Sequence, residues 1–169
     1  MVSLVSVLGV VFFLKDDRKK ETPISCVEGI EIFSPFSRET TGKNGAAFMK
    51  IKNRLNKEIK LKGATLLEAN ACDRIELHDH IVEKKEGQEI FKMVQVEDIL
   101  IPAQETGVLK PKSKHIMFMG LNAPLKEGDN ISLSLDFGED GNCTIPIPVL
   151  EAGSQGPCHC HHKKHRSFF

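Results

Sequence analysis

The chain of 169 residues contains no tryptophan and no tyrosine, and its large aromatic side chains are ten phenylalanines. Proteins that bind single-stranded nucleic acid stack bases on aromatic side chains beside a basic groove. The chain also has no excess charge, with 23 acidic and 23 basic residues. A balanced charge creates no strong field to attract nucleic acid or an anionic membrane. We therefore expect no nucleic-acid partner.

No apolar run in the sequence reaches the length of about 20 residues that a membrane-spanning helix needs. The longest run, residues 2–14, fits the apolar region of a secretory signal, although no Lys or Arg precedes it and no A-x-A-like site follows. We predict that residues 1–20 are a signal peptide or membrane anchor with a linker. The protein would then be periplasmic, exported or tethered to the inner membrane through residues 2–14. A buried N-terminal strand is the alternative.

Motifs of the common enzyme classes are also missing. The sequence has no G-x-S-x-G, Walker loop, Rossmann glycine set, H-E-x-x-H or C-x-x-C. Catalytic groups can converge without a local motif, but nothing in this sequence groups the serines and carboxylates. We predict that the protein is not an enzyme.

What the chain does contain is a series of short strand-like runs separated by turn signals such as "TTGKNG", "KPKSK" and "GEDGN". This pattern is typical of an all-β sandwich or barrel. The predicted strands are 27–33, 46–53, 59–69, 73–80, 89–96, 105–110, 115–121, 130–137 and 143–150. Pro146 and Pro148 make the last of them an edge strand, or one paired through its other groups. We expect one monomeric domain over residues 21–151, long enough to bury a core.

Histidines and methionines alternate with apolar residues in two of these runs. In "HIMFM", His115, Met117 and Met119 would share one face of a strand, and in "IELHDH" so would His78 and His80. Met93 lies in the run between them. Thioethers select Cu(I), and imidazole suits copper generally. The alternative is structural, since methionine often fills cores.

These residues resemble the periplasmic copper chaperone family called PCuAC. That family's motif runs His, a short spacer, Met, 21 residues, then His-x-Met, and here Met93 and His115 have 21 residues between them. The first His of the family lies in a "VELH"-like strand, which here is "IELH". The segments "SRETTGKNGAAFMKIKN" and "VEDILIPAQETGVLKPKSKHIMFMGLNAPLKEGD" are similar as well, so the resemblance covers residues 28–150. It implies a cupredoxin-like Greek-key β-sandwich with four Cu(I) ligands: His78, Met93, His115 and Met117.

One spacing departs from the family. Fourteen residues separate His78 from Met93, more than the family usually has, and we interpret "VEKKEGQE" as a lengthened hairpin loop. Lengthening a loop costs little. His80 lies on the same face and is an alternative or additional ligand, although "IEL" before His78 favours His78. Met119 is a possible further ligand that we expect to pack beneath the site, and Met49 is expected in the core.

The composition changes after residue 151. We predict that 152–169 is a disordered tail in which six ligand-type residues fall within eight positions: Cys158, His159, Cys160, His161, His162 and His165. Short Cys/His-rich tracts bind metals, and some members of the family carry His-rich or Met-rich tails, so this tail would bind Cu(II) or a second copper ion. A solvated basic tail is the alternative, supported by Lys163, Lys164 and Arg166.

Cysteine usage leaves alternatives open. The sequence has five cysteines, an odd number, and the Ile-Ser-Cys at 24–26 is a poor lipidation site because Pro23 stands where an apolar residue belongs. In Greek-key sandwiches of the family's kind the first and last strands often run side by side in parallel. Cys26 and Cys143 begin those strands here, which would allow a disulfide and leaves Cys72 unexplained.

The resemblance implies a copper chaperone. Its partner would be a copper-accepting protein, either a respiratory cytochrome oxidase subunit or an assembly factor of that oxidase. Two alternatives stand beside it: copper storage or detoxification by the tail, and a metal-free β-sandwich interaction module.

Overall fold

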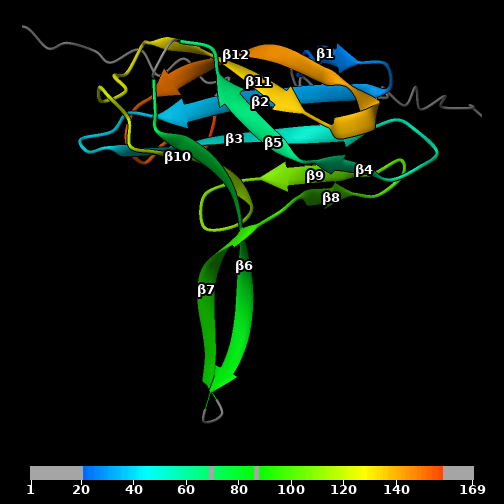
Figure 1. Ribbon diagram of the computed structural model, residues 1–169, viewed down its shortest axis with the longest axis horizontal. Helices are drawn as coiled ribbons and strands as arrows, with labels where there is room; N and C mark the ends of the chain where they lie inside the picture. The colour runs from blue at the N-terminus through cyan, green and yellow to red at the C-terminus, as the bar shows by residue number, and fades with distance from the viewer. Residues whose placement is uncertain (1–20, 69–70, 86–87, 158–169) are drawn as a thin grey trace, which may run out of the picture.

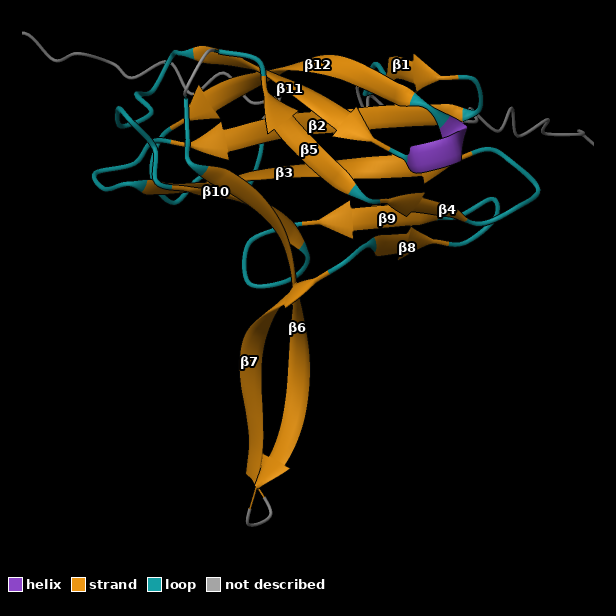
Figure 2. Ribbon diagram, viewed as in Figure 1, coloured by secondary structure: helices purple, strands orange, loops and turns teal. Residues whose placement is uncertain are grey.

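A computed structural model describes residues 21–68, 71–85 and 88–157. Almost every element in this part of the chain is a strand, as Figure 2 shows in orange. The first strands are β1 (Ile24–Val27), β2 (Ile30–Arg38), β3 (Asn44–Asn53), β4 (Ile59–Leu61), β5 (Gly63–Leu66) and β6 (Arg74–Lys85). They are followed by β7 (Gln88–Val96), β8 (Ile99–Ile101), β9 (Thr106–Leu109), β10 (His115–Met119), β11 (Asn130–Asp136) and β12 (Asn142–Leu150). A short 3₁₀ turn, Gly138–Asp140, precedes β12.

The strands are hydrogen-bonded in the order β5-β11-β12-β2-β3-β10-β6-β7, with β1 added to β2 and β9 to β3. A separate pair joins β4 to β8. In Figure 1, β5, β11 and β12 lie over β2 and β3. Both layers contribute to one buried cluster, which includes Leu133 of β11, Ile145 of β12, Ile32 of β2 and Ile51 of β3. The predicted all-β, cupredoxin-like sandwich is confirmed.

Residue alternation explains which side of each strand is buried. In β11 every second residue, from Ile131 to Leu135, is buried, and the serines between them are half-exposed. Met49 is 2% exposed in the core, as expected from the sequence. At Pro146 and Pro148 the strand β12 pairs only with β11, and it pairs with β2 only at Val149 and Leu150. At the two prolines, the edge of β12 that faces away from β11 therefore has no strand among the described residues to which a backbone N–H would donate. This agrees with the prediction that the strand pairs through its other groups.

Several strand bounds differ from the prediction, and one strand is additional. The first predicted run is split at Gly29, whose φ of +77° makes a turn between β1 and β2. The run predicted over 59–69 is interrupted at Lys62, and β4 and β5 enter different sheets. The short β8 was not predicted, because three residues are too few to show a periodicity.

The β6–β7 hairpin projects from the sandwich (Figure 1). The predicted lengthened loop is wrong in its detail, because the two strands pair without interruption from Leu77↔Val96 to Lys85↔Gln88. The additional residues therefore lengthen the hydrogen-bonded ladder. An extended ladder keeps its register with period two, so the insertion leaves the faces of the strands unchanged.

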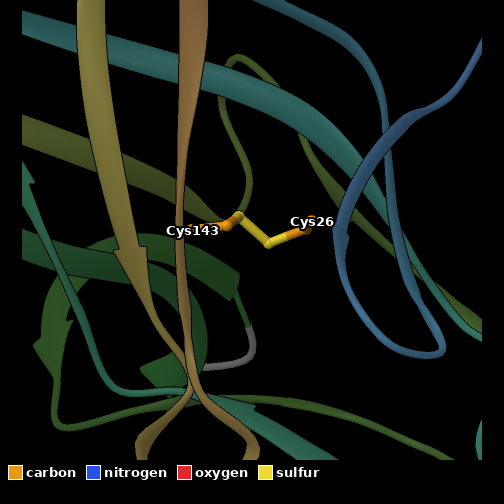
Figure 3. Close-up of a disulfide and its surroundings, with 2 residues drawn as sticks. All are labelled: Cys26 and Cys143. Atoms are coloured by element: carbon orange, nitrogen blue, oxygen red, sulfur yellow. A yellow bond between two sulfur atoms is a disulfide. The ribbon is translucent and has the colours of Figure 1, made fainter.

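A disulfide joins Cys26 of β1 to Cys143 of β12, with their Cα atoms 5.2 Å apart (Figure 3). The predicted pairing is confirmed, but Cys26 lies on β1, which pairs antiparallel with β2, and the strand that runs parallel to β12 is β2. Because its sulfur is bonded, Cys26 has no free thiol for lipidation. Cys72 is a half-buried free thiol whose pKa is raised, chiefly by burial and then by Asp73.

The first six residues of the predicted tail, 152–157, are among the described residues. Residues 152–157 lie against the sandwich, where Arg38 Nε donates to the carbonyl oxygen of Ser154 at 2.7 Å. The backbone N–H of Ala152 donates to Glu39 Oε1 at 3.0 Å. The predicted leader, 1–20, and the predicted tail ligands, from Cys158 onward, lie outside the described residues. Within the described ranges, no helix is long and apolar enough to cross a bilayer.

Candidate metal centre

The candidate ligands lie on the outward face of strands whose inward face is core. Leu77 of β6 is 4% exposed, and Ile116 and Phe118 of β10 are fully buried. Because side chains alternate along a strand, the neighbours His78, His115 and Met117 point away from the core. The same packing that fixes the strands therefore fixes the direction of these three side chains.

The strand register brings the predicted ligands together in two groups. His115 of β10 lies directly opposite His78 of β6, and Met117 lies opposite Glu76. On the other side of β6, Met93 of β7 lies opposite His80, and Gln95 lies opposite His78. All of these positions share one face of the sheet. His78 is thus central, with His115 beside it and Met93 and Met117 at its two diagonals.

The two imidazoles form the best-defined part of the site. The ring centroids of His78 and His115 are 5.3 Å apart, with an edge-on interplanar angle of 64°. His115 Nδ1 is 2.7 Å from the carbonyl oxygen of Ser113. A carbonyl can only accept, so Nδ1 carries the hydrogen and Nε2 of the neutral ring keeps a free lone pair. That lone pair can bind a metal ion.

Burial favours the neutral form of His115. The pKa of its imidazole is lowered from the ordinary value, mainly because burial disfavours the charged form. The hydrogen bond to the Ser113 carbonyl and the charge of Asp79 act in the opposite direction, whereas His78 adds to the lowering. A neutral imidazole is the form that binds metals.

Glu76 orients the other imidazole. Its Oε2 lies 2.8 Å from His78 Nε2, so the carboxylate accepts a hydrogen from that nitrogen and leaves Nδ1 with the lone pair. The pKa of Glu76 is lowered, first by the hydrogen bond from Arg74 and then by the one from His78. A carboxylate that holds the second nitrogen of a metal-binding histidine is a recurrent arrangement.

The thioethers are less constrained. Met93 is 42% exposed at the base of the hairpin, and Met117 is half-buried. His80, opposite Met93, lies with its Nδ1 3.4 Å from Asp79 Oδ1. Met119 is further along β10 and lies opposite Arg74, away from the two imidazoles. Met93 and Met117 flank His78 from opposite sides of β6, and their long flexible chains allow both sulfurs to turn toward an ion there.

The donor set suits Cu(I) as cargo. Two neutral imidazoles and two thioethers are borderline and soft donors, which select a monovalent copper ion. Within the described ranges, no group of three or more His, Cys, Asp or Glu side chains is gathered around a metal position. The fit therefore depends on the methionine sulfurs.

Sequence reasoning missed two groups of this site. Glu76 lies two residues before His78, and the period of two alone places it on the same face. The Ser113 carbonyl that orients His115 belongs to a turn, and no sequence pattern indicates it.

Comparison with known proteins places the fold in a class. The fold is that of PCuAC domains: the copper-bound PCuAC domain from PmoF2 matches with a TM-score of 0.62 and 16% identity, covering 78% of this chain and 99% of that one. Apo-DR1885 from Deinococcus radiodurans matches with a TM-score of 0.53 and 20% identity, covering 90% of this chain and 95% of the other. At these identities the likeness concerns the fold.

The family is shown by sequence. A family model described as "Putative lipoprotein LpqE-like" matches residues 30–149. "Putative lipoprotein Lxx21020" from Leifsonia xyli subsp. xyli (strain CTCB07) is 30% identical over 131 residues, covering 78% of this chain and 75% of its own length. The chain belongs to the LpqE-like family.

Proposed function

We propose that this protein is a copper chaperone that carries Cu(I) on His78, Met93, His115 and Met117. The observation that carries the proposal is the cross-strand pair of His78 and His115, each with one ring nitrogen already held and the other available. The same face supplies the two methionines. Copper-bound PCuAC domains share the fold, which supports a copper cargo.

The work of the site is transfer. Neutral ligands hold a monovalent ion without excess negative charge, so that an acceptor can replace them one at a time. Met93 is the most exposed of the four and would leave first. The exposed apolar side chain of Val82 lies on the same face of this hairpin as His78 and His80 and offers a contact on which an acceptor docks, whereas Ile81 and Ile90 are exposed on the opposite face. The acceptor is a cytochrome oxidase copper centre or one of its assembly factors, as the resemblance to PCuAC implies.

An extracytoplasmic location suits this role. Disulfides persist in oxidising compartments, and the protein has one between Cys26 and Cys143. The LpqE-like family and the Leifsonia relative bear lipoprotein names. We propose that the chain is exported and held at the membrane or released into the periplasm.

The test is an anaerobic Cu(I) titration against a competing chelator. The titration uses a shortened chain that ends at Pro157, so that the tail cannot bind copper in this experiment. One tight equivalent is expected. Met117→Ala should lower the Cu(I) affinity by more than about 100-fold. Losing a residue that only orients a ligand already lowers metal affinity about 10–100-fold. Met119→Ala, on the same face, is the matched control and should change little. Equal affinity in both variants would contradict the ligand assignment.

His78 and His80 provide a second matched pair, since they lie two residues apart on one face. His78→Ala is expected to abolish tight binding because it removes the imidazole beside His115. His80→Ala should reduce affinity by less than about tenfold, as expected of a group outside the ligand set. A larger loss of affinity in His80→Ala than in His78→Ala would instead make His80 the ligand, together with Met93 opposite it.

A further inference from the structure

An open cavity of about 350 Å³ lies beside His115, the candidate copper ligand at the start of β10. Arg38, the last residue of β2, and Lys112, in the turn before β10, contribute two cationic side chains to its lining. No carboxylate is among the described residues that line this Arg38 cavity. The lining therefore carries a positive charge that no neighbouring acid balances, and such a charge attracts anions.

The guanidinium of Arg38 is held in place but lacks an acceptor for one of its nitrogens. Its Nε donates to the carbonyl oxygen of Ser154 at 2.7 Å, and the group lies 5.5 Å from the centre of the Phe48 ring. Its Nη2 is buried and has no hydrogen-bond partner among the described residues. Leaving a buried charged donor without an acceptor is costly. A carboxylate would remove that cost, because its two oxygens match the planar fork of a guanidinium.

Lys112 is placed at the cavity by an unfavourable backbone conformation. Its φ is +63°, in the left-handed region that Gly, Asn and Asp adopt far more readily than lysine. The backbone N–H of Lys110 donates to the carbonyl oxygen of Lys114 at 2.8 Å, which closes the turn around it. The turn alone would favour a glycine or an asparagine at this position. A strained residue of this kind points to a role for its side chain.

The rest of the lining suits a ligand with a carbon skeleton. Ala46 and Phe48 of β3 and Pro111 of the turn supply apolar surface to the cavity. Its volume of about 350 Å³ falls within the range of pockets that hold small organic molecules, about 300–1,000 Å³. Two cations and an apolar wall together indicate a small organic molecule with two negative charges.

We propose that the Arg38 cavity binds a small organic dicarboxylate. One carboxylate pairs with the guanidinium of Arg38, the other pairs with the ammonium group of Lys112, and the carbon chain between them packs on Phe48. The binding is non-covalent and needs no metal, so the site itself does not depend on the proposed copper cargo.

The turn connects this site to the candidate copper ligand. The carbonyl oxygen that lies 2.7 Å from His115 Nδ1 belongs to Ser113, the neighbour of Lys112. The Phe48 ring lies 6.1 Å from the His115 ring. A dicarboxylate that holds Lys112 against Arg38 therefore also steadies the group that orients His115. The benefit for copper binding rests on the proposed function.

A succinate titration of the metal-free full chain tests the site. It is followed by NMR at constant ionic strength, because salt screens exposed cations. Saturable shifts with one midpoint are expected for the rings of Phe48 and His115 and for the backbone N–H of Lys112. Arg38→Gln and Lys112→Asn should each weaken succinate binding by about tenfold or more, since each removes a charge-assisted contact. Asparagine tolerates the left-handed conformation, so Lys112→Asn keeps the turn even where Arg38→Gln loosens the contact with Ser154.

Controls separate this site from general attraction of anions. Arg54→Gln removes an arginine paired with Glu31, Lys126→Gln removes an exposed lysine, and both should leave the affinity for succinate unchanged. Succinamide, which has the same carbon chain without charge, should not bind. Inorganic phosphate should bind more weakly than succinate, because it has no carbon chain to pack on Phe48.

Three results would overturn the proposal: no saturable shifts with succinate, equal succinate affinity in Lys112→Asn and the parent chain, or phosphate binding at least as tight as that of succinate. Failure of the proposed function would look different. In that case succinate binds as described, and the chain ending at Pro157 takes up no Cu(I) tightly.

Discussion

Each imidazole of the candidate site is prepared for one metal bond by a group that holds its other nitrogen. For His115 that group is the carbonyl of Ser113, and for His78 it is the carboxylate of Glu76. Holding the ring in this way fixes both its tautomer and its orientation before the proposed copper ion binds. The readiness of the site therefore depends on residues that never touch the metal.

Glu76 offers the most direct test of this preparation. Glu76→Ala is expected to weaken Cu(I) binding about 10–100-fold, because His78 loses the hydrogen bond that orients its ring. Glu76→Gln should recover part of that loss, since its amide oxygen still accepts. Competition titrations with a chelator give the affinities. Glu105→Ala, an exposed glutamate elsewhere on the surface, is the control, and a loss there equal to that in Glu76→Ala would contradict the account.

The lowered pKa of His115 predicts a pH effect on the metal-free protein. The ordinary pKa of a histidine is about 6.5, so below about that pH the unfolded chain binds a proton that the folded chain does not yet bind. The free energy of unfolding should therefore fall as pH falls from that value to the folded pKa, and then level off. Denaturant titrations across this range measure the fall. His115→Gln should make the free energy of unfolding fall less over this pH range. The same fall in the variant as in the parent chain would contradict the assignment to His115.

At the scale of elements, the site depends on alternation along three neighbouring strands. The sequence gives this information directly: the period of two in "IELHDH" and "HIMFM" assigns the faces correctly, and buried Leu77 and Ile116 explain why. The pairing of His115 with His78 could not be predicted from spacing alone. It arises because β10 lies between β3 and β6 in the sheet order, which is a property of the whole fold.

The hairpin provides a test of alternation. Removing Glu83, Lys84, Glu89 and Ile90 shortens both strands of the β6–β7 ladder by two residues and keeps every remaining side chain on its face. Cu(I) affinity should then stay within about threefold of that of the parent chain. Met93 remains opposite His80, and only the far end of the hairpin becomes shorter. Competition titration measures it.

Deleting Val94 alone is the matched contrast. With Val96 held opposite Leu77, the loss of one residue turns Met93 to the other face. The affinity should fall as far as in Met93→Ala. Normal affinity after this deletion would show that Met93 does not bind through the register described.

At the scale of the whole molecule, the disulfide ties the first strand to the last across 117 residues of sequence. Replacing both partners, Cys26→Ser with Cys143→Ser, should lower the free energy of unfolding by about 2–5 kcal/mol. Copper affinity should be unchanged, because the site lies on β6, β7 and β10. Denaturant unfolding and copper titration measure the two effects, with Cys72→Ser as the single-thiol control. A fall in copper affinity in the double variant would contradict the view that the disulfide lies apart from the copper site and does not affect it.

The end of the chain shows where sequence reasoning stops. A change in composition at residue 152 suggests a tail, yet residues 152–157 are held by Arg38 and Glu39 through backbone groups. Backbone hydrogen bonds leave no mark on composition, so this boundary could be seen only in the fold. For the same reason the composition does not indicate that Gln155 lines a cavity beside His115.

The central claim is that two imidazoles and two thioethers bind one Cu(I), and X-ray absorption spectroscopy of the copper-loaded chain ending at Pro157 tests it most directly. The account predicts sulfur and nitrogen neighbours in equal number around a monovalent ion. The sulfur signal should fall in the Met93→Ala and Met117→Ala variants. A copper ion with only nitrogen or oxygen neighbours, or with sulfur neighbours that both variants leave unchanged, would contradict the account.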